Sequence, residues 1–218
     1  MRKRNIALIL AASMMATFAF GGTTAFAAEE GKTDSVTVGI MADPENMGPW
    51  SGMSMGRIAV LFTTYEYLLT REDGVAYGVL AKSWDEVDPK TYDVELYDYI
   101  HDAAGNPLTA SDVVFSFESA IATKNYGKLS VIDSVTATDD YHVEFKFNKD
   151  LEIGEFENVM LECAIVTQAA YEASPDQMAT TPVGTSAYLV DSYVPGSEIV
   201  MKDTGDYWQT DESLVHGT

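Results

Sequence analysis

The chain has 218 residues, a formal net charge of −21 and one cysteine, and 46% of its residues are hydrophobic. This apolar content is enough for a packed core, so the chain is globular rather than disordered. The negative charge repels phosphate backbones and anionic lipid headgroups, which argues against nucleic acid and membrane surfaces as partners.

The first residues have the form of an export signal. Three basic residues (2–4) precede an uncharged apolar run (6–20) that is too short to span a bilayer as a mature helix. Ala25-Phe26-Ala27 then supplies the A-x-A pattern of a signal peptidase site. We predict that residues 1–27 are a signal peptide, with an uncleaved anchor as the alternative. Its removal leaves no integral membrane segment and a still more acidic chain.

The next segments predict a strand, a loop and a helix. Val36, Val38 and Ile40 alternate with smaller or polar residues, which predicts a strand over 35–41. Residues 45–56 are rich in Gly, Met, Ser and Pro and are typical of a loop. Apolar residues then recur at helical intervals, which predicts a helix over 57–69.

The middle of the chain predicts further regular elements. Alternation over 91–96 predicts a strand with one wet face. Thr109 and Asp112 have capping-box spacing, which predicts a helix over 110–122. Two hairpins are predicted, one from 132–135 to 141–147 and one from 188–193 to 199–202 with Pro195-Gly196 in its turn. Mixed strands and helices of this kind indicate an α/β protein of more than one lobe.

No catalytic or metal-binding pattern is evident. The three histidines have no second ligand at zinc spacing, and the sequence contains no G-x-S-x-G, H-E-x-x-H or phosphate-binding glycine loop. Cys163 lies among apolar residues, which favours a buried thiol. We therefore predict no enzyme activity, no metal site and no cofactor, and a secreted hydrolase is the disfavoured alternative.

The loop over 47–55 is the best candidate for a binding site. It combines Trp50 with Met53 and Met55, and flexible, polarizable methionines suit surfaces that accept varied ligands. We predict that these three residues contact ligand. The alternative is that they pack against the helix that follows. Trp84, Phe115, Phe117 and Trp208 are assigned to the core.

Four segments, in order, resemble the family-5 extracellular solute-binding proteins, the oligopeptide-, dipeptide- and nickel-binding class of ABC importers. They are Leu80-Ala81-Lys82-Ser83-Trp84-Asp85, then the strand over 91–96, then the stretch from His101 to Glu118 with its Pro-Leu-Thr-Ala-Ser-Asp-Val-Val-Phe core, and finally Pro182-Val183-Gly184-Thr185 with Asp206-Tyr207-Trp208 behind it. Departures from the family pattern include two added residues after His101 and Ser186-Ala187 in place of Gly-Pro.

The resemblance implies a fold, a domain plan and a function. It implies an α/β, periplasmic-binding-protein-like type II fold, incomplete, with only the first lobe and its small subdomain. It places the first segment of lobe I at 28–62, an inserted small subdomain at 63–166 and the return to lobe I at 167–218. It also implies capture of small peptides for ABC permease subunits, with nickel, haem or sugar ligands and a purely structural cell-surface role as alternatives.

The resemblance also bears on length and location. Family members are more than twice as long, so we expect an N-terminal fragment that lacks the second lobe, binds peptides weakly or not at all by itself and self-associates as salt is raised. The lipid-anchor cysteine of many family members is missing, which predicts an exported protein that is periplasmic or extracellular. Within the family, the loop over 47–55 is expected near the mouth of the cleft between lobes.

Overall fold

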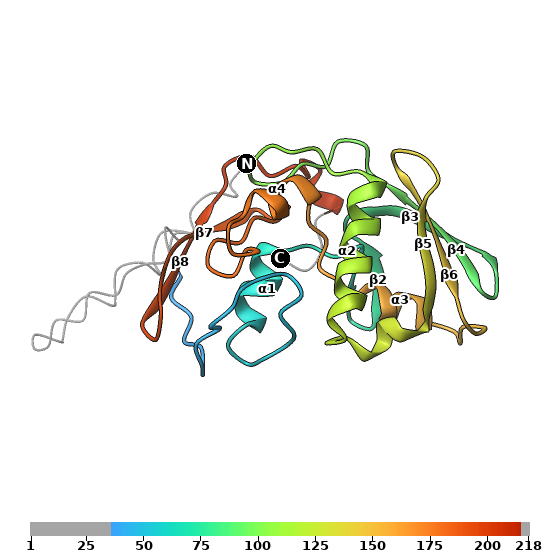
Figure 1. The fold of residues 1–218 in the computed structure, drawn as a ribbon. Helices are drawn as coiled ribbons and strands as arrows, with labels where there is room; N and C mark the ends of the chain where they lie inside the picture. The colour runs from blue at the N-terminus through green and yellow to red at the C-terminus, as the bar shows by residue number, and fades with distance from the viewer. Residues whose placement is uncertain (1–35, 215–218) are drawn as a thin grey trace, which may run out of the picture. The chain divides into compact units, whose positions relative to one another are not determined.

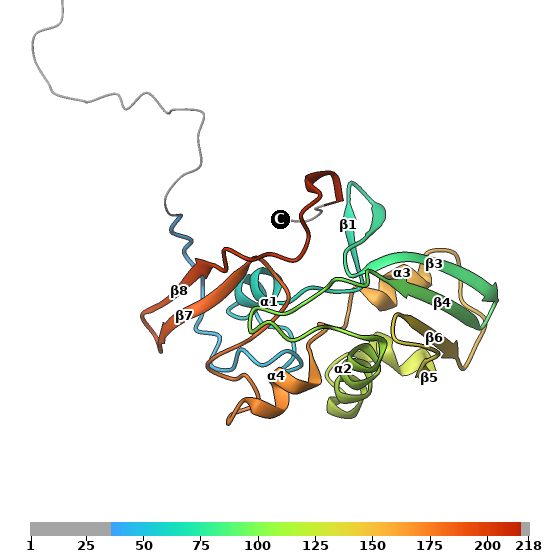
Figure 2. The same ribbon diagram turned by 90° about the horizontal axis from the view of Figure 1, so that it is seen from above.

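The computed structural model describes residues 36–214, in which short helices alternate with antiparallel strands (Figures 1 and 2). The predicted signal peptide lies outside these residues. The helices and strands of the described part all belong to one compact unit that begins at Gly39. A mixed α/β fold is thus confirmed. None of the helices in residues 36–214 combines the length and the hydrophobicity that a bilayer crossing requires.

The largest sheet has four antiparallel strands in the order β3-β4-β6-β5. They are β3 (Ala81–Asp88), β4 (Thr91–Leu96), β5 (Ile132–Ala137) and β6 (His142–Phe147). The predicted strand over 91–96 and the predicted hairpin over 132–147 are confirmed. Strand β3 was not predicted. Along β4 and β6 the apolar residues alternate with polar ones, so one face of the sheet is buried and the other is polar.

Helix α2 (Ala110–Thr123) lies along the buried face of this sheet in both views (Figures 1 and 2). The predicted capping box is present at its start, where the Asp112 carboxylate accepts hydrogen bonds from Thr109 N at 2.8 Å and Thr109 Oγ1 at 2.9 Å. The helix ends at Thr123, and the C-cap residue Lys124 that follows has a left-handed φ of 61°. The helix prediction is confirmed to within one residue at its end.

Several short elements escaped prediction. They are the β1 (Leu69–Glu72) and β2 (Val75–Gly78) hairpin, the 3-10 turns η1 (Gly127–Val131) and η2 (Glu212–Leu214), and helices α3 (Glu155–Met160) and α4 (Gln168–Ala173). The hairpin turns at Asp73 and Gly74, with φ of 50° and 83°, a backbone that Asp-Gly adopts readily. Each of the two helices has six residues, too few to establish a helical period.

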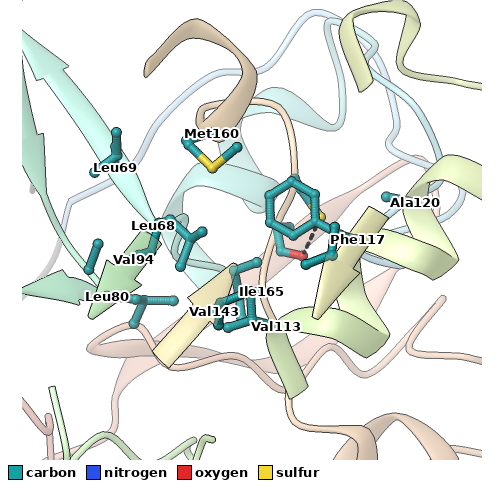
Figure 3. Close-up of a cluster of buried hydrophobic side chains, with 14 of the residues drawn as sticks. Leu68, Leu69, Leu80, Val94, Val113, Phe117, Ala120, Val143, Met160 and Ile165 are labelled. Carbon is teal, nitrogen blue, oxygen red and sulfur yellow. Dashed lines mark hydrogen bonds between the residues drawn. The ribbon is translucent and has the colours of Figure 1, made fainter. Parts of the chain in front are cut away.

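The main core joins α2, the sheet and the segments that lead into and out of them (Figure 3). Phe117 of α2 packs edge-on against Phe145 of β6 at 4.9 Å, and Phe156 of α3 stacks on Tyr92 of β4 at 4.2 Å. The chain enters and leaves this region side by side, because Glu66 and Ile165 form an antiparallel bridge. Figure 3 labels ten of the buried side chains, Leu68, Leu69, Leu80, Val94, Val113, Phe117, Ala120, Val143, Met160 and Ile165.

A second, smaller apolar cluster holds the hairpin of β7 (Tyr188–Val194) and β8 (Glu198–Asp203) against α1 (Ile58–Thr64). Met47, Val60 and Val190 form its buried centre. The Asp43 carboxylate accepts hydrogen bonds from Tyr193 Oη and Gly196 N, which ties the hairpin turn to the loop before α1. The predicted second hairpin is confirmed.

Two predictions near the N-terminus were wrong in part. Residues 36–40 form no regular structure, and Val36 and Val38 are 77% and 70% exposed, because no strand in the described residues pairs with them. Position 35 lies outside the described residues. The helix predicted over 57–69 covers only Ile58–Thr64. Tyr65 is extended, and Glu66 then pairs with Ile165. The apolar residues after Thr64 therefore lie on extended chain rather than on a helix.

Candidate functional site

The loop over 45–56, correctly predicted as irregular, has its backbone fixed from several sides. Met47 N donates to Ala179 O at 2.8 Å, and Tyr65 Oη donates to Met47 O at 3.0 Å. Asn125 Nδ2 donates to Trp50 O at 2.9 Å. These contacts satisfy backbone groups that a loop without regular structure would otherwise leave unpaired. The loop is therefore a built element that can present side chains in a defined place.

Arg57, at the start of α1, holds the other side of this loop. Its Nε lies 3.0 Å from both Pro44 O and Asn46 O, and its Nη1 donates to Ser51 O at 2.9 Å. One planar guanidinium thus donates hydrogen bonds to three backbone carbonyl oxygens, because its N–H groups point in different, fixed directions.

Trp50 lies in the core, with 5% of its surface exposed. Its Nε1 donates to Ala164 O at 3.0 Å, and its ring packs against Tyr171 at 4.9 Å and Phe115 at 5.7 Å between centroids. An indole enclosed in this way supports the loop from beneath. The structure does not bring Trp50 to the surface with the two methionines.

Met53 and Met55 lie at the surface, 50% and 64% exposed. Ile58 and Phe62 of α1 are also exposed, at 38% and 54%. Positions 55, 58 and 62 follow helical spacing, which puts them on one face of the helix and the turn before it. We call Met53, Met55, Ile58 and Phe62 the methionine edge. The helical spacing of Ile58 and Phe62 was noted from the sequence, but it does not show which side faces solvent.

The other reactive groups of the described residues are isolated or engaged. Cys163 is fully buried, and burial raises the pKa of its thiol well above the usual range. His142 lies on the sheet's polar face with Asp139 at 2.9 Å from Nδ1, and this hydrogen bond raises the pKa of the imidazole. Within residues 36–214, no three His, Cys, Asp or Glu side chains are grouped to hold a metal ion.

Glu66 is a further polar centre that sequence reasoning missed. Its carboxylate accepts hydrogen bonds from Tyr207 Oη at 2.6 Å and from Trp208 Nε1 at 2.8 Å. Burial raises the pKa of the Glu66 carboxyl, and the two hydrogen bonds act in the opposite direction without cancelling the effect. The donors are more than 140 residues away in the chain, so no local pattern could reveal the pairing. The contact docks the C-terminal segment on the crossover between Glu66 and Ile165.

Comparison with known proteins places this architecture. Residues 76–216, well over half of the chain, match the bacterial extracellular solute-binding proteins, family 5. The chain is 30% identical over 151 residues to the nickel-binding protein NikA of Staphylococcus aureus, covering 68% of this chain and 30% of that protein. It is 25% identical over 190 residues to di/tripeptide-binding protein 3 of Pseudomonas aeruginosa, covering 72% and 35%.

A solved structure gives the same result for the fold. NikZ from Campylobacter jejuni, in complex with Ni(L-His), superposes with a TM-score of 0.69 at 23% identity, over 79% of this chain and 36% of that one. These matches define a class of solute-binding proteins, which are not catalytic. The chain belongs to family 5 of the bacterial extracellular solute-binding proteins. It spans about a third of the length of the relatives that it matches.

Proposed function

We propose that this chain belongs to the substrate-binding component of an ABC importer, which captures peptides outside the cytoplasmic membrane and delivers them to permease subunits. Family membership supports the importer, and the similarity to a di/tripeptide-binding protein supports the peptide. Small peptides vary in their side chains, so their binding surface must tolerate variety. Export through cleavage of residues 1–27 belongs to the same proposal.

The methionine edge is the single observation that carries the site. Four apolar side chains that are close in sequence are exposed on the end of the loop and on α1, and the loop backbone before them is fixed by Arg57, Asn125 and Tyr65. Unbranched thioethers adapt to different partners without repacking the protein beneath them. A rigid base under adaptable side chains suits a binding wall, since less ordering is needed when ligand arrives. Met53 and Met55 would contact ligand, and Trp50 would support them from below.

The domain plan remains part of the proposal. The Glu66–Ile165 bridge brings together the two chain segments that bound the region predicted as an inserted subdomain, residues 63–166. In this plan the flanking segments, 28–62 and 167–218, belong to lobe I. The contact between α1 and β7 supports their grouping, because these two elements come from the two sides of the insertion.

A nickel complex is the second candidate ligand, favoured by the 30% identity to a nickel-binding protein. The two ligands can be separated in one experiment on protein labelled with ¹³C at the methionine methyl groups. Dipeptides and tripeptides at millimolar concentration should shift the methyl signals of Met53 and Met55. The buried Met47 and Met178 serve as internal references, since neither is exposed. A nickel–histidine complex is titrated in parallel.

The matched variants are M53S/M55S at the proposed wall and V87S on β3, where Val87 is 64% exposed and far along the chain. Because M53S/M55S lacks the two reporter methyl groups, titration calorimetry measures binding in both variants. Loss of peptide binding in the first and its retention in the second is the expected result. If only the nickel complex binds, the ligand is a nickel complex and the proposal of a peptide ligand is wrong. If neither ligand perturbs the methyl signals, the methionine edge is not a binding wall.

A further inference from the structure

Arg57 carries a positive charge that no acidic group of the described residues neutralises. Six of the lysines in this part of the chain form ion pairs with carboxylates, namely Lys82, Lys90, Lys128, Lys146, Lys149 and Lys202. Arg71 and Lys124 lie at exposed positions, where water screens their charge, and Arg71 also donates to Gly74 O and Asn158 Oδ1. Arg57 is half-buried, so it keeps less of its water shell. In a chain with 34 acidic residues, an unpaired and partly desolvated arginine is unexpected.

The guanidinium is also only partly used as a donor. Its Nε and Nη1 bind the three loop carbonyls, whereas Nη2 makes no hydrogen bond to another group within residues 36–214. The group cannot rotate freely to find one, because the other donors fix its plane. A guanidinium that is fixed in place and has an unused N–H group can donate a hydrogen bond to a ligand. A carboxylate is the most suitable acceptor, because it is planar and negatively charged.

Its location connects this charge with the methionine edge. Arg57 lies in sequence between Met55 and Ile58, and its Nη1 touches Ser51 O, two residues before Met53. Two residues of chain reach at most about 7 Å, so the guanidinium lies within reach of a small ligand resting on the methionines. Two acidic residues near Arg57 in sequence are engaged elsewhere, Glu66 by Tyr207 and Trp208 and Asp43 by Tyr193 and Gly196.

We propose that Arg57 anchors a carboxylate group of the ligand, with the methionine edge contacting its apolar part. The proposal rests on the binding function proposed above and adds that the ligand must carry a carboxylate. Two sources share this chemistry: the C-terminus of a peptide and the amino-acid carboxylates of a nickel chelate. The pair would be partly exposed, so its contribution to affinity is modest, about three- to fivefold.

The test changes the ligand and leaves the protein intact. Methionine-methyl NMR titrations of the 218-residue chain compare the dipeptide Ala-Phe with its C-terminal amide, and nickel–L-histidine with nickel–L-histidinamide. If the ligand is a peptide, Ala-Phe should bind about three- to fivefold more tightly than its amide. If the ligand is a nickel chelate, the same preference should hold for nickel–L-histidine over nickel–L-histidinamide. Equal affinity of acid and amide in both pairs overturns the anchoring role while leaving the binding function standing.

Three variants complete the cycle. R57Q should bind acid and amide equally, and R57K, which keeps the charge without the fork, should retain part of the preference. R71Q removes the same charge from an exposed site and should keep the full preference. A preference that survives in R57Q means that another group binds the carboxylate. If the unmodified protein binds none of the four compounds, the proposed function itself fails, and the anchoring role with it.

Discussion

Glu66 and Trp208 lie 142 residues apart and are joined by a hydrogen bond of 2.8 Å, in which the indole Nε1 donates to the carboxylate. Because the folded-state pKa of Glu66 is raised, the folded protein holds this proton more tightly than the unfolded chain. The resulting stabilisation is complete below the ordinary pKa of 4.5 and is lost as pH rises through the raised folded value. Burial of Glu66 therefore makes its contribution to stability most favourable in mildly acidic solution.

Replacing Glu66 with glutamine should remove this pH dependence. The amide oxygen still accepts from Trp208 Nε1, and Tyr207 Oη can accept from the new amide, so the fold is retained. Urea unfolding at several pH values above 4.5 should therefore show a flatter profile for E66Q than for the unmodified protein. E118Q, on the exposed side of α2, is the charge-matched control. Equal slopes for both variants would show that Glu66 does not titrate as proposed.

Asp112 caps two helices with one carboxylate. Its Oδ2 serves Thr109 at the start of α2, and its Oδ1 accepts from Gln168 N, at the start of α4, at 2.8 Å. T109A should cost about 1 kcal/mol in unfolding free energy, and D112A roughly 2 kcal/mol because two helix starts lose an acceptor. Urea melts measure both, with S111A as a neutral neighbour. A smaller loss for D112A than for T109A would refute the double cap.

The role of Trp50 can be separated from that of the methionines by stability. W50F keeps an aromatic ring but leaves the buried Ala164 carbonyl without its donor, which should cost about 1–3 kcal/mol. W50A should cost about 3–5 kcal/mol, the range for a large buried aromatic. M53L, at an exposed position, should change stability by less than about 0.5 kcal/mol. A harmless W50A would mean that the indole is not part of the core.

Gly184 is required by a close approach of two backbones. A Cβ added there would lie 2.0 Å from Thr64 O and 2.9 Å from Thr64 C, atoms that cannot move aside cheaply. G184A should therefore destabilise the protein by several kcal/mol, on the order of the largest single-residue effects. At Gly127 a Cβ meets nothing within 4 Å, so G127A is the control and should be tolerated. Thermal melts of the two variants compare them directly.

Local signals explain which elements could be predicted. Helix α2 has both a capping box and a helical apolar spacing, and β4 and β6 alternate strictly, so each contains its own evidence. The β1–β2 hairpin was missed although Asp73-Gly74 is a recognised turn pair, because its strands have four residues each. Alternation over 36–40 indicates a strand only if a partner exists, and the sequence around it cannot supply one.

The irregular backbone of the candidate site could be predicted, but the burial of its side chains could not. The loop over 45–56 was correctly predicted as irregular, yet residue type alone could not separate the buried Trp50 from the exposed Met53 and Met55. That distinction depends on Ala164 and Tyr171, which lie more than 110 positions along the chain. Arg57 was overlooked because an arginine at a helix start carries no pattern until its three carbonyl partners are known.

The Glu66–Ile165 bridge also has a mechanical consequence. If the chain is pulled from outside this pair, tension passes across the bridge from one segment to the other, and the sheet of β3 to β6 carries no load. Once the bridge and the neighbouring Trp50–Ala164 hydrogen bond have broken, the chain between Glu66 and Ile165 bears the force directly. In an optical trap this would be a single rip that releases roughly 35 nm of contour length, the reach of the chain between Glu66 and Ile165.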